Sequence, residues 1–314
     1  MSATLWTYVV FGIVLAVAII FDLGLLSKRS KSISIKQAFY QTLFWVILAL
    51  IFGAFIWYQN GQTKAVEYIS AYLMEWSLSI DNIFVFILIF NFFGVEKKYY
   101  GRVLLLGILM AIIFRIIFIT IGIALVNNFS WVLYIFGAFL LYTGIKMFFV
   151  EQGDEYDPGE NKVYKFLKKI LPLTGNDPGG RYTVYIGKKR YFTTLFVVVL
   201  MLASTDVVFA LDSIPAVFAI TQSKVIIYTS NIFAVLGLRS LFFLLRGAVS
   251  KFDYLQQGIA VVLVFVGIKM LIEFFNIHLP IWVSLSVIIV CIAASIIFSI
   301  YHKKIDIPED NIDE

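Results

Sequence analysis

The chain has 314 residues, of which 61% are hydrophobic and 14% are charged, and its mean hydropathy is +0.91. These values lie outside the range of soluble globular domains and exclude that class, so we expect a membrane protein that crosses the bilayer several times. The net charge of +5 is explained by anchoring at an anionic membrane surface. No pattern of basic and aromatic residues indicates nucleic-acid binding.

Apolar runs long enough to cross a hydrocarbon core of about 30 Å, about 20 residues each, follow one another along the whole chain. We predict nine transmembrane spans, at residues 5–26, 39–58, 66–93, 102–126, 130–150, 192–220, 225–246, 255–276 and 281–301. The first run has no basic segment before it and no small-residue cleavage site, so we interpret it as a retained helix rather than a signal peptide.

Lysine and arginine residues gather in alternate loops. They follow the first, third, seventh and ninth predicted spans, whereas the other short loops carry only Lys64 and Lys224. Because basic loops stay in the cytoplasm, this asymmetry predicts an external N-terminus and a cytoplasmic C-terminus.

The sequence resembles itself on either side of a polar segment at residues 151–191. Both copies contain, in the same order, an acid pair six residues apart (Glu75 and Asp81; Asp206 and Asp212), an arginine (Arg115; Arg239) and the tetrapeptide GIKM (144–147; 267–270). A unit of three helices enters the second time from the opposite side of the membrane, so the copies are inverted. Transporters with this architecture place their site near the bilayer midplane, between the repeats.

The expected fold class is therefore an all-α polytopic membrane protein with two inverted three-helix repeats. Two N-terminal helices (1–65) precede the first repeat (66–150), and a cytoplasmic loop (151–191) with a β-hairpin around Gly187-Lys188 separates it from the second repeat (192–276). A last helix and a cytoplasmic tail (277–314) complete the chain.

The four acids, Glu75, Asp81, Asp206 and Asp212, are the candidate functional residues, because a carboxylate in hydrocarbon persists only beside a partner, a cavity or an ion. Six positions along an unbroken helix place two side chains about 120° apart, so one ion could not contact both. We expect interrupted helices. In the second copy Pro215 cannot donate to the carbonyl of Leu211, which is then free as an oxygen ligand.

The predicted site offers hard ligands. Four carboxylates with the amide of Asn82, the hydroxyl of Ser213 and the Leu211 carbonyl suit Mn²⁺, Ca²⁺ or Mg²⁺ and disfavour Zn²⁺ and copper. Cys291 is the single cysteine, and both histidines lie at span ends or in loops, so sulfur and imidazole ligation are unsupported. No prosthetic group is expected.

Several basic residues are candidate counter-ions for these acids. Arg115 and Arg239 would balance two of the four negative charges, and a divalent cation or protons would balance the rest. Lys146 and Lys269 are either further counter-ions or residues that snorkel to the interface. Asp22 is either interfacial or a supporting acid.

The stretches "EWSLSIDNIFVF", "DVVFALDSIPAVFAIT" and "SNIFAVLGLRSLFFLL", with the second GIKM, closely resemble the TerC family of integral membrane proteins, within the LysE-like group of exporters. The resemblance covers residues 5–300. It implies a bacterial inner-membrane protein, with the family's functional acids at Glu75, Asp81, Asp206 and Asp212. Members, including the Alx type, are implicated in manganese export and in alkaline-pH or tellurite-resistance phenotypes. Many carry a glutamate at the position of Ala203, so one oxygen ligand or proton carrier is missing here.

Three functions follow from these patterns. The leading hypothesis is a secondary transporter that exports divalent cations, Mn²⁺ first, in exchange for protons, and Ca²⁺/H⁺ exchange is a variant of it. The rival is a membrane assembly or stress-response factor that uses the 151–191 loop as a docking surface, with the acids serving structure. An enzyme is disfavoured, because the chain has no nucleophile-base set, no HExxH motif and no nucleotide-binding loop.

Overall fold

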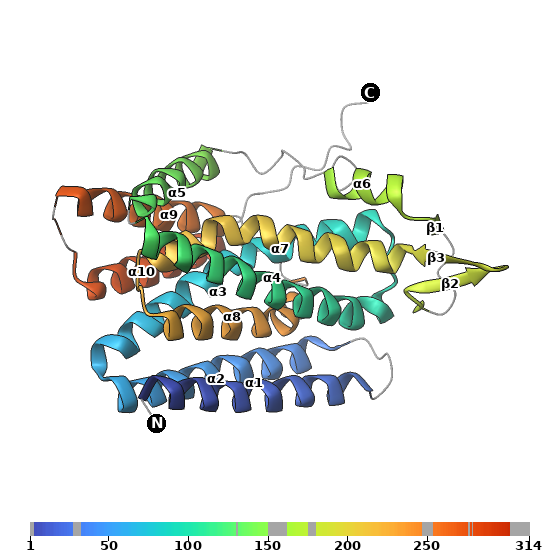
Figure 1. Ribbon diagram of the computed structural model, residues 1–314, viewed down its shortest axis with the longest axis horizontal. Helices are drawn as coiled ribbons and strands as arrows, with labels where there is room; N and C mark the ends of the chain where they lie inside the picture. Colours follow the sequence, from blue (N-terminus) through green and yellow to red (C-terminus); the bar gives the residue numbers. More distant parts are fainter. Residues whose placement is uncertain are drawn as a thin grey trace.

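The computed structural model describes residues 3–27, 33–129, 131–149, 162–174, 180–246, 254–275, 277 and 279–301. Over these residues the fold is a bundle of long helices that run in roughly one direction, with a small sheet at one end (Figure 1). The helices are α1 (Ala3–Ser27), α2 (Ile35–Asn60), α3 (Gln62–Phe92), α4 (Tyr100–Asn128), α5 (Val132–Phe149), α6 (Lys162–Ile170), α7 (Thr194–Phe218), α8 (Lys224–Leu245), α9 (Leu255–Ile272) and α10 (Ile281–Tyr301).

The chain is an all-α polytopic membrane protein. Seven of the described segments are long and apolar enough to cross a membrane: Ile35–Asn60, Lys97–Asn128, Val132–Phe149, Thr194–Leu211, Lys224–Leu245, Gln257–Phe275 and Trp282–Ser299. The predicted first and third spans coincide with α1 and α3, which are helical but are not among the seven. The count of nine spans therefore stays a prediction.

Local sequence explains where the helices begin and end. At the start of α2, the Ser34 hydroxyl accepts the Gln37 backbone N–H at 3.3 Å and the Gln37 side chain accepts the Ser34 N–H at 3.2 Å, which is a capping box. Gly61, with φ of +86°, separates α2 from α3 in a conformation that other residues rarely adopt.

Each helix of the first predicted repeat packs against a helix of the second. α3 packs against α8, α4 against α7, and α5 against α9. The glycines of the two GIKM segments make the last contact possible, because a Cβ atom on Gly144 would lie 2.8 Å from the backbone nitrogen of Val264, and one on Gly267 would lie 2.7 Å from that of Leu141. Small residues allow such close approach between membrane helices. The repeat remains a prediction, and this pairing is what two inverted copies would give.

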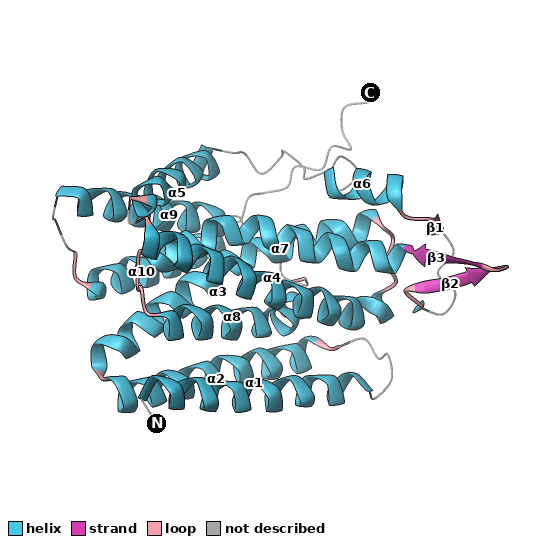
Figure 2. Cartoon of the chain, in the orientation of Figure 1, coloured by secondary structure: helices cyan, strands magenta, loops and turns pink. Residues whose placement is uncertain are grey.

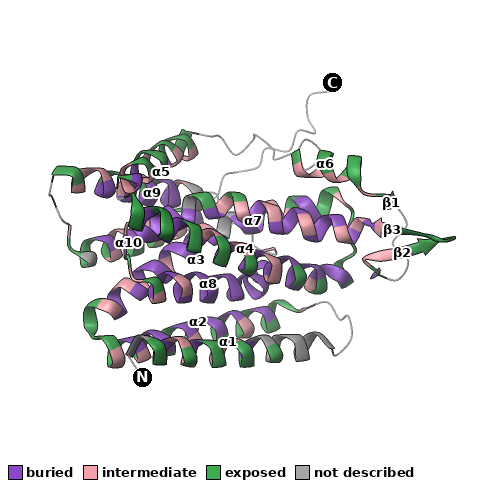
Figure 3. Ribbon diagram, in the orientation of Figure 1, coloured by how far each residue is buried: buried purple, intermediate pink, exposed green. Residues whose placement is uncertain are grey.

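α8 lies at the centre of the bundle. Most of its side chains are buried between α2, α3 and α4, whereas α1, α5 and α10 expose much of their surface (Figure 3). The exposed side chains are mainly large and apolar, as expected of helices that face lipid.

A three-stranded sheet lies at the end of the bundle where α7 begins (Figure 2). Its strands are β1 (Leu173–Thr174), β2 (Thr183–Ile186) and β3 (Lys189–Thr193), in the order β1-β3-β2. β2 and β3 pair antiparallel from Thr183↔Phe192 to Ile186↔Lys189, and Gly187, with φ of +63°, occupies the turn where the alternating sequence predicts a hairpin. Residues 151–161 and 175–179 of the polar segment lie outside the described residues.

The expectation of interrupted helices is wrong. α3 is one continuous helix through both of its acids, and α7 continues through Pro215 to Phe218. A proline removes one backbone hydrogen bond, and neighbouring membrane helices compensate for it, so the helix persists. The acids of one helix therefore do not converge through a broken turn, and any site must be assembled between helices.

Candidate functional site

Arg115 of α4 joins acids from both predicted repeats. Its guanidinium donates through Nε to one oxygen of Asp206 and through Nη2 to the other, both at 2.9 Å, and through Nη1 to Glu75. Arg115 is 1% exposed, and both carboxylates are as deeply buried. A planar guanidinium that grips a carboxylate by two bonds is a strong and geometrically specific pair.

Two matching stripes of small or polar residues meet at this pair. On α3 the stripe is Glu75, Ser79 and Asn82, at positions i, i+4 and i+7, which face the same side of a helix. On α7 the equivalent positions carry Asp206, Ala210 and Ser213. All six residues are buried. Glu75 therefore shares a helix face with Asn82, the residue after Asp81. In the same way Asp206 shares a helix face with Ser213, the residue after Asp212.

A small cavity of about 80 Å³ opens beside Arg115. Its lining residues are Glu75, Leu78, Asn82, Arg115, Met147, Phe209, Ser213 and Leu263, from helices of both predicted repeats. A cavity of this size has room for water or a partly hydrated ion, since one water needs roughly 10–15 Å³.

Three oxygen atoms of this lining accept no hydrogen bond within the described part of the chain. They are Oε2 of Glu75, Oδ1 of Asn82 and Oγ of Ser213, and Oγ of Ser79 on the α3 stripe is in the same condition. A buried polar atom without a partner costs about 1–3 kcal/mol, so most such atoms in proteins are occupied by a partner, a water or an ion. This donor set consists only of hard oxygens and fits Mn²⁺, Mg²⁺ or Ca²⁺.

The structure describes two of the four predicted acids. Glu75 and Asp206 are brought together through Arg115, whereas the side chains of Asp81, Asp212 and Asp22 lie outside the described residues. Among the side chains that are described, no three of the types His, Cys, Asp and Glu gather as a metal site. The described charges at the site, two carboxylates and one guanidinium, sum to minus one.

The other predicted residues lie in varied surroundings. Arg239 is buried in α8, Lys146 is exposed on α5, and the side chain of Leu211 is exposed on the outer side of α7. Lys269 is 5% exposed and donates to the Ala219 carbonyl at 2.9 Å and to the Ser284 hydroxyl at 3.1 Å. Its positive charge therefore lies at the C-terminus of α7, where the helix dipole favours a cation.

Sequence reasoning did not single out Asn231. This α8 residue accepts a hydrogen bond at 3.2 Å from Arg115 Nη1, the same nitrogen that donates to Glu75, and it donates to the Ile227 carbonyl at 2.9 Å, so it helps to orient the guanidinium. A second amide, Asn82, donates to Asp206 at 3.3 Å. The available signal was the asparagine itself, since a polar side chain in an apolar span usually has a partner.

Comparison with protein families matches residues 60–306 to the family described as integral membrane protein TerC. The chain belongs to the TerC family. The match includes all helices that contribute to the cavity and both copies of the predicted repeat.

Full-length relatives in this family share about two fifths of their residues with the chain. An uncharacterized membrane protein of Rickettsia felis is 42% identical over 298 residues, covering 95% of this chain and 98% of the relative. A membrane protein of Myxococcus xanthus is 42% identical over 303 residues, covering 96% and 94%. Alx of Escherichia coli strain K12, whose name describes a candidate membrane-bound redox modulator, is 42% identical over 287 residues, covering 88% and 89%. No solved structure matches the chain.

Ala203 occupies the position where the family resemblance leads us to expect a glutamate. Ala203 is buried on α7 and does not line the acidic cavity; it forms part of the wall of a larger apolar cavity beside α6. A missing glutamate at this position therefore leaves the described oxygen set around Glu75 unchanged.

Proposed function

We propose that this TerC family protein is a secondary transporter of the bacterial inner membrane that exports divalent cations, Mn²⁺ first, in exchange for protons. The N-terminus is external and the C-terminus cytoplasmic. The observation that carries the proposal is the cavity of about 80 Å³ with three oxygens, from Glu75, Asn82 and Ser213, that have no partner among the described residues. Asp81 and Asp212 are proposed as further ligands.

Mn²⁺ is placed first for two reasons. The donors of the lining that lack a partner among the described residues are hard oxygens, which suit Mn²⁺ as well as Mg²⁺ and Ca²⁺. The family resemblance adds manganese export to this chemistry.

The charge of the site supports exchange with protons. Arg115 balances one of the two described carboxylates, so these three groups together carry one negative charge. A divalent cation and protons would compete for the oxygens that face the cavity, so entry of the cation would displace protons and its departure would restore them.

The test is uptake of Mn²⁺ into inverted membrane vesicles, with and without a pH gradient. Asp206→Asn keeps the shape of the side chain and removes its charge, so uptake should fall at least tenfold. The matched control is Glu67→Gln, because Glu67 is also an acid of the bundle but bonds Lys64 and Thr221, whereas Asp206 bonds Arg115, which lines the cavity. Equal uptake by both variants and the wild type at matched expression would overturn the proposal.

A second candidate, a membrane assembly or stress-response factor, is favoured by one observation. Arg115 already satisfies both oxygens of Asp206, as expected of a purely structural ion pair. The two functions differ in their response to metal. A bound cation stabilises the native state by mass action, so millimolar Mn²⁺ should raise the unfolding temperature of a transporter and leave that of an assembly factor unchanged.

A further inference from the structure

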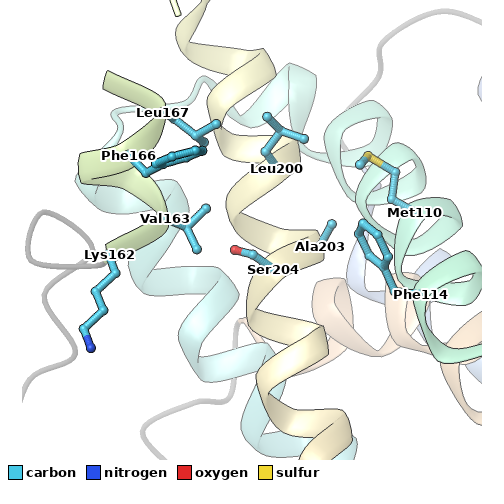
Figure 4. A pocket seen from close by; sticks show the side chains of 9 residues that line it. All are labelled: Met110, Phe114, Lys162, Val163, Phe166, Leu167, Leu200, Ala203 and Ser204. Atoms are coloured by element: carbon cyan, nitrogen blue, oxygen red, sulfur yellow. The ribbon is translucent and has the colours of Figure 1, made fainter. Parts of the chain in front are cut away.

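A second cavity lies between α6 and the bundle, apart from the acidic site (Figure 4). Its volume is about 500 Å³. Met110 and Phe114 of α4, with Leu200 and Ala203 of α7, form its inner wall. Volumes of roughly 300–1,000 Å³ are typical of sites that hold a small organic ligand.

The outer wall is α6, a nine-residue helix of amphipathic sequence. Its basic residues are Lys162, Lys165, Lys168 and Lys169, its apolar residues are Val163, Phe166, Leu167 and Ile170, and it contains no acid. At about 100° per residue the apolar side chains fall on one side of the helix and the lysines on the other. Helices of this kind lie at the interface between a membrane and water and attract anionic lipids.

The apolar side of α6 is only partly covered by the described protein. Val163 and Leu167 are partly buried against the core, whereas Phe166 is 60% and Ile170 58% exposed. In Figure 4 Phe166 and Leu167 turn toward Leu200 across the cavity, while Lys162 lies at the edge and its amino group points away from the rings. Because α4 and α7 both contain segments long and apolar enough to cross a membrane, we place this cavity at the border of the lipid phase.

We propose that this cavity and the lysines of α6 bind one anionic phospholipid. An acyl chain occupies the apolar cavity, and the phosphate group pairs with lysines at the end of α6 that leads to the sheet, chiefly Lys168 and Lys169. Acyl chains are already surrounded by hydrocarbon in the bilayer, so the cavity selects the chain by shape and the lysines select the charge of the headgroup.

A lipid fits the observations better than a protein segment. A peptide in the cavity would bring backbone N–H and C=O groups that need partners. The side chains of the lining offer them the Ser204 hydroxyl, which already donates to the Met201 carbonyl at 2.9 Å, and the amino group of Lys162 at the edge, which points away from the rings. An acyl chain brings no such groups. The proposal rests on α6 and its cavity and does not depend on metal transport.

Native mass spectrometry of the full-length protein tests the charge requirement, with phosphatidylglycerol and phosphatidylcholine as probes. Lys168→Gln/Lys169→Gln should bind phosphatidylglycerol roughly 30-fold more weakly, at about a fivefold effect per lysine, and phosphatidylcholine as before. The control is Lys188→Gln/Lys189→Gln, which removes an adjacent lysine pair from the β2–β3 hairpin at the same end of the bundle. Unchanged binding by the α6 variant, or equal losses in both variants, would overturn the proposal.

The cavity is tested separately by filling it. Ser204→Phe places a ring in the cavity from α7 and should abolish the one-lipid adduct for both lipids, whereas Ser204→Ala should keep it. Leu200→Trp fills the same space from the preceding turn and serves if Ser204→Phe does not fold. Retention of the adduct in a folded, cavity-filled variant would show that the lipid binds elsewhere and that the assignment is wrong.

Discussion

Replacing Arg115 with methionine removes the cation that lies between the two described acids. The change retains an unbranched side chain and leaves Glu75 and Asp206 buried without their partner. Removing one member of a buried ion pair costs about 3–5 kcal/mol. Hydrogen bonds between membrane helices average about 0.6 kcal/mol each, so the bonds of Arg115 counted as neutral contacts would give only about 2 kcal/mol. Because the cost of leaving buried charges without a partner exceeds the cost of the lost hydrogen bonds, we expect a loss of about 3–5 kcal/mol in the free energy of unfolding.

The measurement is equilibrium unfolding of the purified protein in mixed micelles, followed by circular dichroism as the denaturing detergent is increased. The control is Arg246→Met, since Arg246 is half-buried after α8 and its guanidinium lies 5.1 Å from the centre of the Tyr100 ring, a contact of about 0.5–1 kcal/mol. A loss for Arg115→Met no larger than the control would refute the reasoning. Adding Asp206→Asn to Arg115→Met should cost less than the sum of the single changes, because one of the two uncompensated charges is gone.

Three further predictions concern packing, coupling and topology. Gly267→Ala should destabilise the protein by about 1–3 kcal/mol, because the added Cβ would lie 2.7 Å from a backbone nitrogen of α5. The control Gly12→Ala should be neutral or stabilising, because an added Cβ there would have nothing within 4 Å. Equal effects of the two substitutions on the free energy of unfolding would contradict the close contact of α5 and α9. Export of Mn²⁺ should respond to the transmembrane pH gradient, and Glu75→Gln should flatten that response because it removes a proton acceptor; wild-type transport that is indifferent to the gradient would leave facilitated export instead. Tags after residues 2 and 314 should report opposite sides of the membrane, the first external; two cytoplasmic tags would rule out the nine-span topology and the inverted repeat with it.

The sequence by itself determined the membrane class and most of the helical architecture. Runs of apolar residues fix where helices form in lipid, because every backbone polar group there must be bonded within its own segment. Residues 39–58, predicted as a span, accordingly lie within α2, and the predicted span 225–246 matches α8 to within one residue at each end. The alternating residues around Gly187 indicated the hairpin for an equally local reason, because a two-residue turn has a backbone twist that matches the twist of the two strands it joins.

Only the tertiary structure decided which polar residues face one another. The spacing of six residues between the acids of each pair drew attention to Asp81 and Asp212. The helix faces that meet at Arg115 follow spacings of four and seven residues instead. They place Glu75 beside Asn82 on α3 and Asp206 beside Ser213 on α7. A helical period is visible in a sequence, but the choice of neighbouring helix and its rotation is not. Asn231 lies 116 residues from Arg115, and its hydrogen bond exists because α4 and α8 pack side by side. Such a contact depends on how side chains of different helices fit together, and no local pattern encodes that.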